Sequence, residues 1–320
     1  LGPALAAGNS IVIKPAETAS LLLIRLCELA HEAGLPEGVL NLVTGFGTSV
    51  GEAMSLSPGI DVLAFTGSGA VGRRIMENAA QSNLKRTYLE LGGKSANIVF
   101  ADAPDMDVAI AGAVSAIFRN SGQVCVAGSR LLVEQSIHDE FIQAVCKAAA
   151  DLKVGDPLTI GNDIGAVHNT FQLEKNMAAL ARADKEGCVI LQGGGRLHEE
   201  TGGLYMEPAI VSGVNASHDL FQNEVFGPVL GVTAFADEAE AIALSNATDY
   251  GLAGGVWTSD LARAHRMIAG MKTGVVTVNS YGAVDVTAPL GGVKKSGNGY
   301  DKSLHAINKY VDLKTAWIQL

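Results

Sequence analysis

The sequence predicts an α/β fold built on a parallel sheet that helices cover on both faces. Short apolar runs alternate with longer amphipathic segments along the 320 residues, and the 38 glycines fall between these runs. Near-continuous apolar strands separated by helices are typical of parallel sheets buried on both sides. The length suits two domains, each large enough to bury its own core.

The first block of alternating elements ends near residue 91. Its expected strands are residues 10–14, 39–43 and 62–65. Its expected helices are one that Thr18 or Ser20 caps and that stops at Gly34, one that runs through Met54, and one over 71–80.

The second block begins at residue 92 and continues the alternation. Its expected helices are residues 105–119, 138–152, 238–246 and 261–271. Its expected strands are residues 130–134, 189–191, 209–211, 229–235, 255–258 and 275–278. The last segment, residues 311–317, alternates apolar and polar side chains with a period of two. This period predicts a half-buried strand added to a sheet, in this chain or in a neighbouring subunit.

Charge and composition exclude several classes of partner. The chain has 33 acidic and 23 basic residues, a net charge of −10, and no cluster of Lys and Arg. Nucleic acid and anionic membrane surfaces are therefore not expected partners. No apolar run approaches the roughly 20 residues of a membrane span, and no secretion signal is visible. Four cysteines without a CxxC motif do not make a disulfide framework. We expect a reducing, cytoplasmic location.

A glycine-rich turn, FTGSGAVG over residues 65–72, follows the third expected strand and leads into a helix. Such a turn presents backbone N–H groups and the positive end of a helix to a phosphate, although many such turns are only tight turns. Lys14 and Glu17 follow the first strand. At the carboxyl edge of the same sheet they would grip the hydroxyls of a ribose. The alternative is a surface ion pair.

Two residues are candidates for the chemistry. Cys125 lies in the polar, tightly turned loop FRNSGQVCVAGSR (118–130), where a substrate can reach a thiolate. The other three cysteines fit as small apolar residues. Glu90 lies in LELGGKSANIVF (89–100), where partial burial would raise its pKa towards neutrality and make it a usable base. The alternative for Glu90 is a solvated strand residue. A third motif, NEVFGPV (223–229), places Glu224 and Phe226 at a turn.

These motifs, taken together and in order, resemble the NAD(P)-dependent aldehyde dehydrogenase superfamily. The strings that carry the resemblance are IVIKPAE, FTGS with a glycine four residues after its serine, LELGGKS, FxNxGQxCxAGSR, EVFGPV and PxGGxKxSGxG. The resemblance covers all 320 residues. The segments GGVWTSDLARAHRM and SGNGYDKSLHAINKYVDLKTAWI resemble the branch that acts on γ-glutamylamino-, guanidino- and amino-aldehydes.

The resemblance implies a Rossmann-type coenzyme domain, a related α/β catalytic domain and a C-terminal oligomerisation strand. We expect residues 1–91 to form the C-terminal portion of the NAD-binding domain, 92–287 the catalytic domain, and 288–320 the tail with the oligomerisation strand. A homodimer or homotetramer is the implied assembly. A small aldehyde is the implied substrate, and no metal is required: the seven histidines are scattered without paired ligand spacing.

The resemblance also assigns roles to single residues. Cys125 matches the nucleophile and Glu90 the general base. The positions that match coenzyme contacts are Lys14 and Glu17 for the adenosine ribose, Gly67 and Ser68 for the pyrophosphate, Val71 for the adenine, and Glu224 and Phe226 for the nicotinamide ribose and ring. The Glu17 carboxylate would repel a 2′-phosphate, which favours NAD over NADP. In the loop 279–287, Asp285 would meet the amino end of an ω-aminoaldehyde, or it is a solvated loop acid.

The sequence departs from the family pattern at three places. Leu290 replaces an aromatic residue, which makes the pocket wall aliphatic, and Tyr300 stands where the family has Arg. The family's oxyanion-binding Asn lies in a motif upstream of Leu1. We therefore expect these 320 residues alone to turn over aldehyde at least about a hundredfold more slowly than a complete enzyme and to self-associate.

Three alternatives to aldehyde oxidation remain open at this point. One is a non-catalytic remnant that binds coenzyme. Another is a cysteine hydrolase, with His138 or His168 as the base. The last is a CoA-acylating relative, against which the LELGG context of Glu90 argues.

Overall fold

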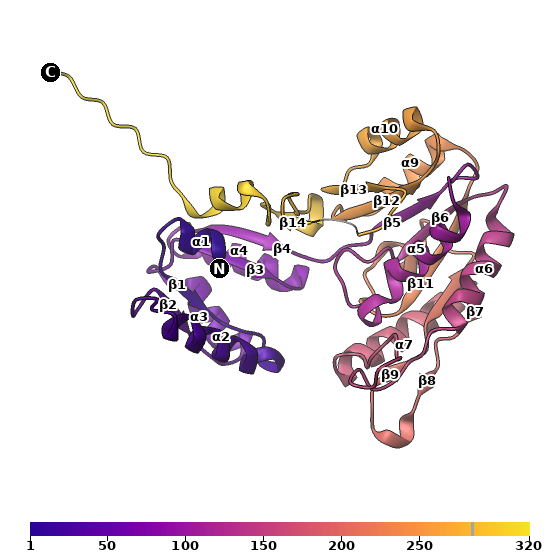
Figure 1. The fold of residues 1–320 in the computed structure, drawn as a ribbon, viewed down its shortest axis with the longest axis horizontal. Coiled ribbons are helices and arrows are strands. Elements are labelled where there is room, and N and C mark those ends of the chain that lie inside the picture. The colour runs from indigo at the N-terminus through magenta and orange to yellow at the C-terminus, as the bar shows by residue number, and fades with distance from the viewer. Residues whose placement is uncertain (283–284) are drawn as a thin grey trace. The chain divides into compact units, whose positions relative to one another are not determined.

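The computed structural model describes residues 1–282 and 285–320, which divide into two compact units (Figure 1). Unit 1 comprises Leu1–Glu90, Asp285–Leu290 and Gly297–Leu320, and unit 2 comprises Leu91–Val284 and Gly291–Ser296. Among the described residues, no helix has the length and apolar character needed to cross a membrane.

Unit 1 contains two small sheets. In the first, β1 (Ile11–Ile13) pairs in parallel with β2 (Leu40–Leu42). In the second, β4 (Arg86–Glu90) lies between β3 (Val62–Thr66), which is parallel to it, and β14 (Gly297–Asn298), which is antiparallel. We expected β1 and β3 in one sheet, and this was wrong for the described residues. β1 bonds to β2 alone, and no described strand joins β1 and β3.

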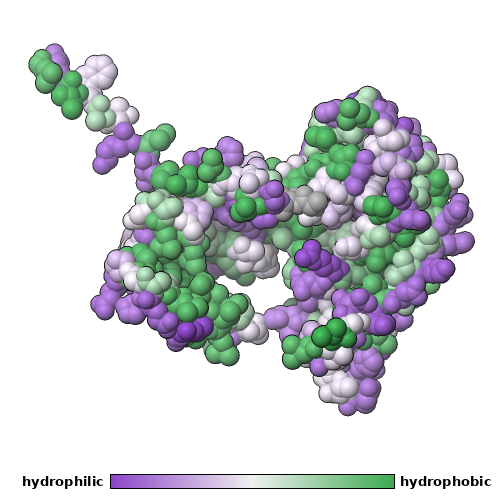
Figure 2. All heavy atoms as spheres, in the orientation of Figure 1, coloured by the Kyte–Doolittle hydropathy of each residue, from purple (hydrophilic) through white to green (hydrophobic). Residues whose placement is uncertain are grey.

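The helices of unit 1 follow its strands closely. They are α1 (Gly2–Ala6), α2 (Ser20–Glu32), α3 (Glu52–Leu56) and α4 (Gly69–Gln81), with short turns η1 (Glu17–Ala19), η2 (Gly47–Gly51, π-helical) and η6 (Leu304–Tyr310). The N-cap of α2 is Ala19, which makes no side-chain cap hydrogen bond, so the expected cap at Thr18 or Ser20 was wrong. The reason is that the turn η1 ends directly at the start of the helix. Leu21 and Leu22 of α2 are 82% and 75% exposed. Apolar residues gather over this helix in Figure 2.

The C-terminal ten residues form no strand or helix, which differs from the strand expected over 311–317. Arg86 holds the start of this segment, through a hydrogen bond to the Val311 carbonyl (3.3 Å) and an ion pair with Asp312 (2.9 Å). Beyond that point the segment extends away from the rest of unit 1 (Figure 1). A strand needs a partner strand for its backbone groups, and no described strand pairs with residues 311–320.

Unit 2 is organised around one seven-stranded sheet. The strands are β5 (Ala96–Val99), β6 (Arg130–Glu134), β7 (Val189–Gln192), β10 (Ala209–Ser212), β11 (Val229–Phe235), β12 (Ala253–Trp257) and β13 (Val275–Val278). Their order is β13-β12-β5-β6-β11-β10-β7. All neighbours are parallel except β10 and β7.

Helices cover both faces of this sheet. They are α5 (Met106–Phe118), α6 (His138–Ala150), α7 (Thr170–Lys185), α8 (Asp219–Gln222), α9 (Glu238–Asn246) and α10 (Leu261–Gly270). Short elements complete unit 2: η3 (Arg119–Gly122), η4 (Glu199–Thr201), η5 (Lys294–Ser296), β8 (Arg196–Leu197) and β9 (Tyr205–Met206).

Successive strand residues point to opposite faces and fill two separate cores. Ile98 and Leu132 pack with α7, α9 and α10, whereas Val99 and Leu131 pack with α5 and α6. Most strands and helices lie within a few residues of their predicted bounds, and the α/β fold class with a mainly parallel, doubly covered sheet is confirmed.

Candidate active site

Three segments of unit 2 meet where the chain enters three adjacent strands. The strands β5, β6 and β11 are parallel neighbours, so the residues that precede them lie at the same edge of the sheet. Gly93 precedes β5, Cys125 precedes β6, and Glu224 precedes β11. The Gly93 N–H donates a 2.9 Å hydrogen bond to Glu224 Oε1. A side chain at position 93 would collide with the Cys125 carbonyl. The structure thus brings Cys125 and Glu224 together on the two sides of Gly93.

Cys125 stands at the corner of a β-turn. The turn spans Val124–Ala127 and is closed by a 3.0 Å hydrogen bond from the Ala127 N–H to the Val124 carbonyl. The Cys125 side chain is half-buried. None of the four cysteines, all of them among the described residues, forms a disulfide. A thiol at a turn corner is held by backbone geometry rather than by side-chain packing.

The residues just before this turn adopt an unusual backbone conformation. Asn120, Ser121 and Gly122 have successive φ angles of 53°, 56° and 69°, in the left-handed region that non-glycine residues rarely adopt. Hydrogen bonds hold them there: Asn120 Nδ2 donates to the Gln123 carbonyl (3.1 Å), and Ser121 Oγ donates to the Gly165 carbonyl (2.9 Å). The loop that carries Cys125 is therefore fixed from both sides.

Glu224 is half-buried, and this burial raises the pKa of its carboxyl group. The Gly93 N–H and the charges of Lys175 and Lys94 act in the opposite direction. Glu224 lines a hollow of about 340 Å³ together with Lys175, Ala179, Arg182, Asp219, Asn223, Val225 and Tyr250. Phe226, two residues on, has a φ of 62°. Lys175 is a site candidate that sequence reasoning missed, because helix α7, which carries it, was not predicted.

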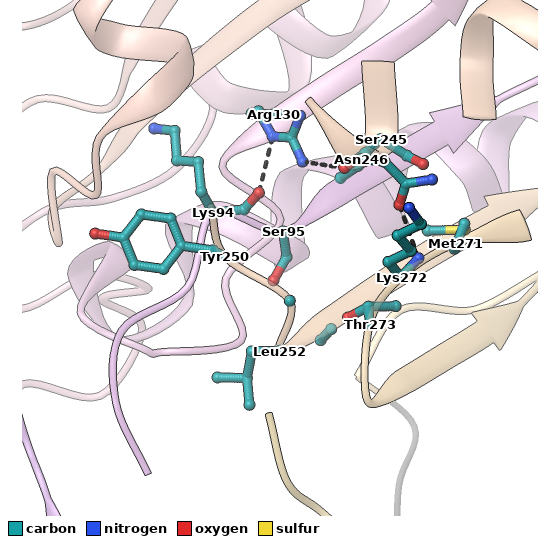
Figure 3. A pocket seen from close by; sticks show the side chains of 13 residues that line it. Lys94, Ser95, Arg130, Ser245, Asn246, Tyr250, Leu252, Met271, Lys272 and Thr273 are labelled. Atoms are coloured by element: carbon teal, nitrogen blue, oxygen red, sulfur yellow. Dashed lines mark hydrogen bonds between the residues drawn. The ribbon is translucent and has the colours of Figure 1, made fainter. Parts of the chain in front are cut away.

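Lys94, which follows Gly93, is a buried basic residue at the wall of a pocket (Figure 3). Lys94 is 1% exposed, its Nζ has no hydrogen-bond partner among the described residues, and burial lowers its pKa to about 7. The Lys94 carbonyl accepts a 2.8 Å hydrogen bond from Arg130 Nε. The other Arg130 nitrogens donate to the carbonyls of Leu244 and Ser245 at 2.7 and 2.8 Å. Arg130 therefore ties β6 to α9 and to the residue that follows Gly93.

The coenzyme candidates of unit 1 follow the ends of parallel strands in its two sheets. Lys14 and Glu17 follow β1 and form an ion pair of 3.4 Å. Lys14 Nζ also donates to the carbonyls of Pro15 (2.7 Å) and Gly45 (3.0 Å). Glu17 Oε1 accepts a 2.8 Å hydrogen bond from the Gly47 N–H, and this bond helps to lower the pKa of Glu17. The pair is part of a built polar turn and not only a surface contact.

Gly67, Ser68 and Val71 lie at the other parallel pair. Gly67 follows β3 and donates its N–H to the Glu90 carbonyl (3.0 Å). Ser68 is the N-cap of α4, and its Oγ accepts a 3.4 Å hydrogen bond from the Val71 N–H. Val71 is an exposed apolar residue in the first turn of this helix. The predicted sequence of strand, glycine turn and helix is thus confirmed.

Glu90 ends β4 and is partly buried, and its pKa is raised to about 7. Burial is the main cause, the Asp301 charge adds to it, and the Lys309 charge opposes it. The prediction that burial brings this pKa towards neutrality is confirmed. Glu90 belongs to unit 1 and Cys125 to unit 2. Asp301 and Lys309 were not singled out from the sequence, because they lie far along the chain from Glu90.

The two substrate-pocket candidates lie in unit 1. Asp285 is exposed, and its Oδ1 accepts hydrogen bonds from the backbone and hydroxyl of Thr287 at 2.7 and 2.5 Å. Leu290 is half-buried and bridges to Asp301 through paired backbone hydrogen bonds of 2.9 and 2.6 Å. Residues 283–284 of the predicted loop 279–287 lie outside the described residues.

The structure gives a contact for each histidine considered for a hydrolase. His138 pairs with its neighbour Asp139 at 2.8 Å on α6, and the backbone N–H of His168 donates to Gln123 Oε1 at 3.1 Å. In the part of the chain that the structure describes, no three His, Cys, Asp or Glu residues group as metal ligands do.

Comparison with known proteins places this arrangement in a family. The sequence profile of the aldehyde dehydrogenase family matches residues 1–316. The chain is 47% identical over 322 aligned positions to the NADP/NAD-dependent aldehyde dehydrogenase PuuC of Escherichia coli, covering 100% of this chain and 64% of that protein. It is 42% identical to the aminoacetaldehyde dehydrogenase of Pseudomonas aeruginosa, covering 99% of this chain and 64% of that protein.

Solved structures agree with these sequence matches. An indole-3-acetaldehyde dehydrogenase crystallised with NAD+ superimposes with a TM-score of 0.98 at 49% identity, covering 100% of this chain and 65% of that one. The chain thus spans just under two thirds of the length of the relatives it matches. From the match over residues 1–316 and these identities, the chain belongs to the aldehyde dehydrogenase family.

Proposed function

We propose that the protein carrying this chain oxidises an aldehyde to a carboxylic acid with NAD, through a thioester on Cys125. The observation that carries the proposal is the half-buried Cys125 thiol at the corner of a β-turn, with Gly93 and the Glu224 carboxylate beside it. Family membership and the NAD(P) dependence printed in the name of the relative PuuC support it.

Cys125 begins the proposed reaction. Its thiolate attacks the aldehyde carbon, so that a sulfur–carbon bond forms and the carbonyl oxygen becomes an oxyanion. The Cys125 N–H, on the same turn, is the donor within this chain for that oxyanion. NAD, when bound with its nicotinamide end near Glu224 and Phe226, would supply the acceptor for a hydride from the substrate carbon. What remains on Cys125 is a thioester.

Glu90 completes the proposed reaction. As a carboxylate it takes a proton from water, and the resulting hydroxide attacks the thioester carbon. The sulfur–carbon bond then breaks, which releases the carboxylic acid and restores the Cys125 thiolate. Glu90 passes its proton to solvent. A pKa near 7 suits this role because the group is then both basic enough to take a proton and largely ionised at slightly alkaline pH.

The residues present fit a dinucleotide. In unit 1 the Lys14–Glu17 turn offers a donor and an acceptor for ribose hydroxyls, and the α4 terminus at Ser68 suits a phosphate. The exposed Val71 suits the flat face of adenine. In unit 2 the hollow lined by Glu224 and Lys175 suits a second ribose. We propose NAD rather than NADP, because the ionised Glu17 would face a 2′-phosphate.

For the substrate we propose an ω-amino- or guanidino-aldehyde, with Asp285 near the cationic end and Leu290 at the acyl end. The name of one relative supports the class: the Pseudomonas aeruginosa relative is an aminoacetaldehyde dehydrogenase. Asp285 Oδ2 takes no part in the Thr287 hydrogen bonds. The ratio of kcat/KM for 4-aminobutanal to that for butanal, before and after Asp285→Asn, tests this. An unchanged ratio would show that Asp285 is a solvated loop acid that does not contact the substrate.

We further propose the domain boundaries, the oligomeric state and the cellular compartment that the sequence suggested. Residues 1–91 would carry the coenzyme, 92–287 the nucleophile, and 288–320 an oligomerisation strand in a homodimer or homotetramer. The exposure of Leu313 and Trp317 supports a tail that pairs with another subunit. Four cysteines without a disulfide support a cytoplasmic location. Sedimentation of the full-length protein with and without residues 311–320 tests the assembly.

The nucleophile is tested by Cys125→Ala in the full-length protein. We expect NADH formation from aldehyde to be abolished while NAD binding, measured by calorimetry, is retained. Cys146→Ala, which alters a half-buried thiol of α6 in the same unit, is the matched control and should keep the parental rate. Full activity of Cys125→Ala would refute the proposal, and ester hydrolysis without any NADH formation would point to the hydrolase alternative.

The base is tested by Glu90→Gln. We expect one equivalent of NADH to form and turnover then to stop, because the thioester is no longer hydrolysed. Glu134→Gln, which changes a carboxylate at the end of β6, serves as the control. A Glu90→Gln enzyme that turns over at the parental rate would remove Glu90 from the mechanism. Rescue of turnover by CoA, with acyl-CoA formed, would reveal the acyl-transferring alternative.

A further inference from the structure

The carbonyl that follows the Cys125 corner has an unusual partner. Val126 occupies the other corner of the turn, and its carbonyl accepts a 2.8 Å hydrogen bond from the hydroxyl of Tyr281. Among the described residues outside helices and strands, no backbone N–H donates to this carbonyl. The turn is closed internally by the Ala127 N–H, so the Tyr281 bond is what joins it to the segment after β13.

The Tyr281 ring is held tightly enough to fix its hydroxyl. A Cβ atom added at Gly255 of β12 would lie 2.6 Å from the Tyr281 ring, and one added at Gly128 would lie 3.0 Å from the ring carbon that bears the hydroxyl. The absence of side chains at these two positions makes room for the ring between the sheet and the loop. A ring confined in this way leaves its hydroxyl little freedom.

The backbone next to Tyr281 is also fixed. The Thr277 hydroxyl donates to the Ser280 carbonyl at 2.7 Å, and the Asn279 side chain bonds to the N–H and the carbonyl of Thr258 at 3.0 Å each. Burial raises the pKa of Tyr281, and a negative charge on Cys125 raises it further. The hydroxyl therefore remains protonated, and remains a donor, at any pH at which the enzyme works.

We infer that Tyr281 is a positioning residue for the nucleophile, which acts by anchoring the Val126 carbonyl and thereby the orientation of the Cys125 turn. The inference rests on the proposed function of Cys125. The peptide after Val126 cannot rotate while its oxygen is bound, and the Cys125 carbonyl is held against Gly93 on the other side. Both fixed carbonyls follow directly after the Cys125 Cα, so they restrict rotation of the backbone there and keep the Cys125 N–H and Sγ in one direction. Reacting groups that are held in one direction react faster.

The test is Tyr281→Phe in the full-length protein. This change keeps the ring and removes only the hydroxyl. We expect the rate of the first NADH turnover to fall about tenfold, the scale of one lost hydrogen bond to a buried carbonyl, with NAD affinity unchanged. Deuterium exchange of the peptide spanning residues 123–129 should become faster. Tyr205→Phe, whose ring packs on His198 and not on the loop, is the matched control.

A second variant disturbs the hydrogen bond between Tyr281 and the Val126 carbonyl by moving the ring. Gly255→Ala keeps the hydroxyl but displaces the ring, so it should speed exchange of residues 123–129 and slow the first turnover in the same direction as Tyr281→Phe. It also keeps the inference open to refutation if Tyr281→Phe does not fold. A parental first-turnover rate together with parental exchange in the folded variants would overturn the inference. If the parent protein itself forms no NADH, the proposed function fails, while the exchange measurement still reports on the anchor.

Discussion

The ammonium group of Lys309 forms an ion pair with the carboxylate of Asp301, in which the lysine side chain is 7% exposed and the acid 44% exposed. Both charges affect the pKa of Glu90: the Asp301 carboxylate raises it, and the Lys309 ammonium group lowers it. The three groups come from η6, from the segment after β14 and from the end of β4. The aromatic rings of Tyr88 and Tyr310 lie 5.9 and 5.7 Å from Lys309 Nζ. The pair is placed to set the proton affinity of the proposed base.

The rate of thioester hydrolysis should therefore depend on pH near neutrality. Glu90 acts as a base only when ionised, and its pKa of about 7 means that the rate falls as pH drops through 7. Lys309→Met removes the charge that lowers this pKa, so the acidic limb of the pH–rate profile should move to higher pH. Asp301→Asn should move it to lower pH. Profiles of steady-state turnover check both, and Lys153→Met, an exposed lysine of unit 2, is the control. Identical profiles would contradict the assignment.

Coenzyme choice should depend on Glu17. The carboxylate is ionised at neutral pH, because its hydrogen bonds lower its pKa. Glu17→Gln keeps a partner for the Gly47 N–H but removes the charge, so kcat/KM with NADP should rise about threefold to tenfold relative to NAD. Glu28→Gln, which alters an exposed ion pair on α2, should leave the ratio unchanged. The same ratio in both variants would exclude Glu17 from the ribose site.

The proposed role of Glu224 in coenzyme binding can be tested by changing Gly92, which lies against the Glu224 carboxylate. A Cβ atom at Gly92 would collide with the Glu224 carboxylate. Because that carboxylate is the end of a flexible side chain, Gly92→Ala should fold, but it should break the hydrogen bond to Gly93. We expect NAD affinity to fall about tenfold. Gly195→Ala, whose added Cβ would lie an ordinary 3.8 Å from Glu207 Oε2, is the control. Parental NAD affinity, measured by calorimetry, would show that Glu224 does not hold the coenzyme.

Buried Lys94 should make stability rise with pH. An ordinary lysine has a pKa of 10.5, as expected in the unfolded chain, and burial lowers the pKa of Lys94 to about 7 in the folded chain. Between these two pH values the unfolded chain therefore binds more protons. The free energy of unfolding then increases by up to about 1.4 kcal/mol per pH unit above pH 7. Lys94→Met should lose this slope and gain about 1–3 kcal/mol at pH 7.5, because the unpartnered amine is gone. Urea unfolding of both proteins at several pH values checks this, and equal slopes would contradict it.

Local patterns predicted the elements that carry most of the sites. The strands β6 and β11 and the helices α6 and α10 follow from apolar runs and amphipathic periods, since these segments are buried in the way that their patterns imply. The half-buried strand β13 and helix α9 also lie where they were expected. The motif spacing gave the candidates Cys125 and Glu224, which the structure brings to one edge. For Glu90 only the partial burial was predicted; β4, which ends at Glu90, was not among the expected strands.

What the patterns missed depends on contacts between distant segments. Helix α7 buries Asn176 and two alanines beside Leu173 and Leu180, so its apolar stripe is weak and Lys175 went unnoticed. The Asp301–Lys309 pair and the Tyr281 anchor join residues far apart in sequence, and no local period reports such a contact. The separation of β1 from β3 depends on which strands pair, which single-strand patterns do not determine.

The left-handed backbone of Asn120 and Ser121 bears on the order in which the chain folds. Each residue held in that conformation costs about 1–2 kcal/mol, so the isolated segment does not adopt it by itself. Its fixed points are the Gly165 carbonyl and the Gly227 carbonyl against which Gly122 packs, and both come later in the chain. The segment can adopt its native backbone conformation only after residues 165 and 227 have taken their native positions. We therefore expect the loop that carries Cys125 to be among the last parts of the chain to fold. A newly made chain would then have its Cys125 thiol correctly oriented only when folding is nearly complete.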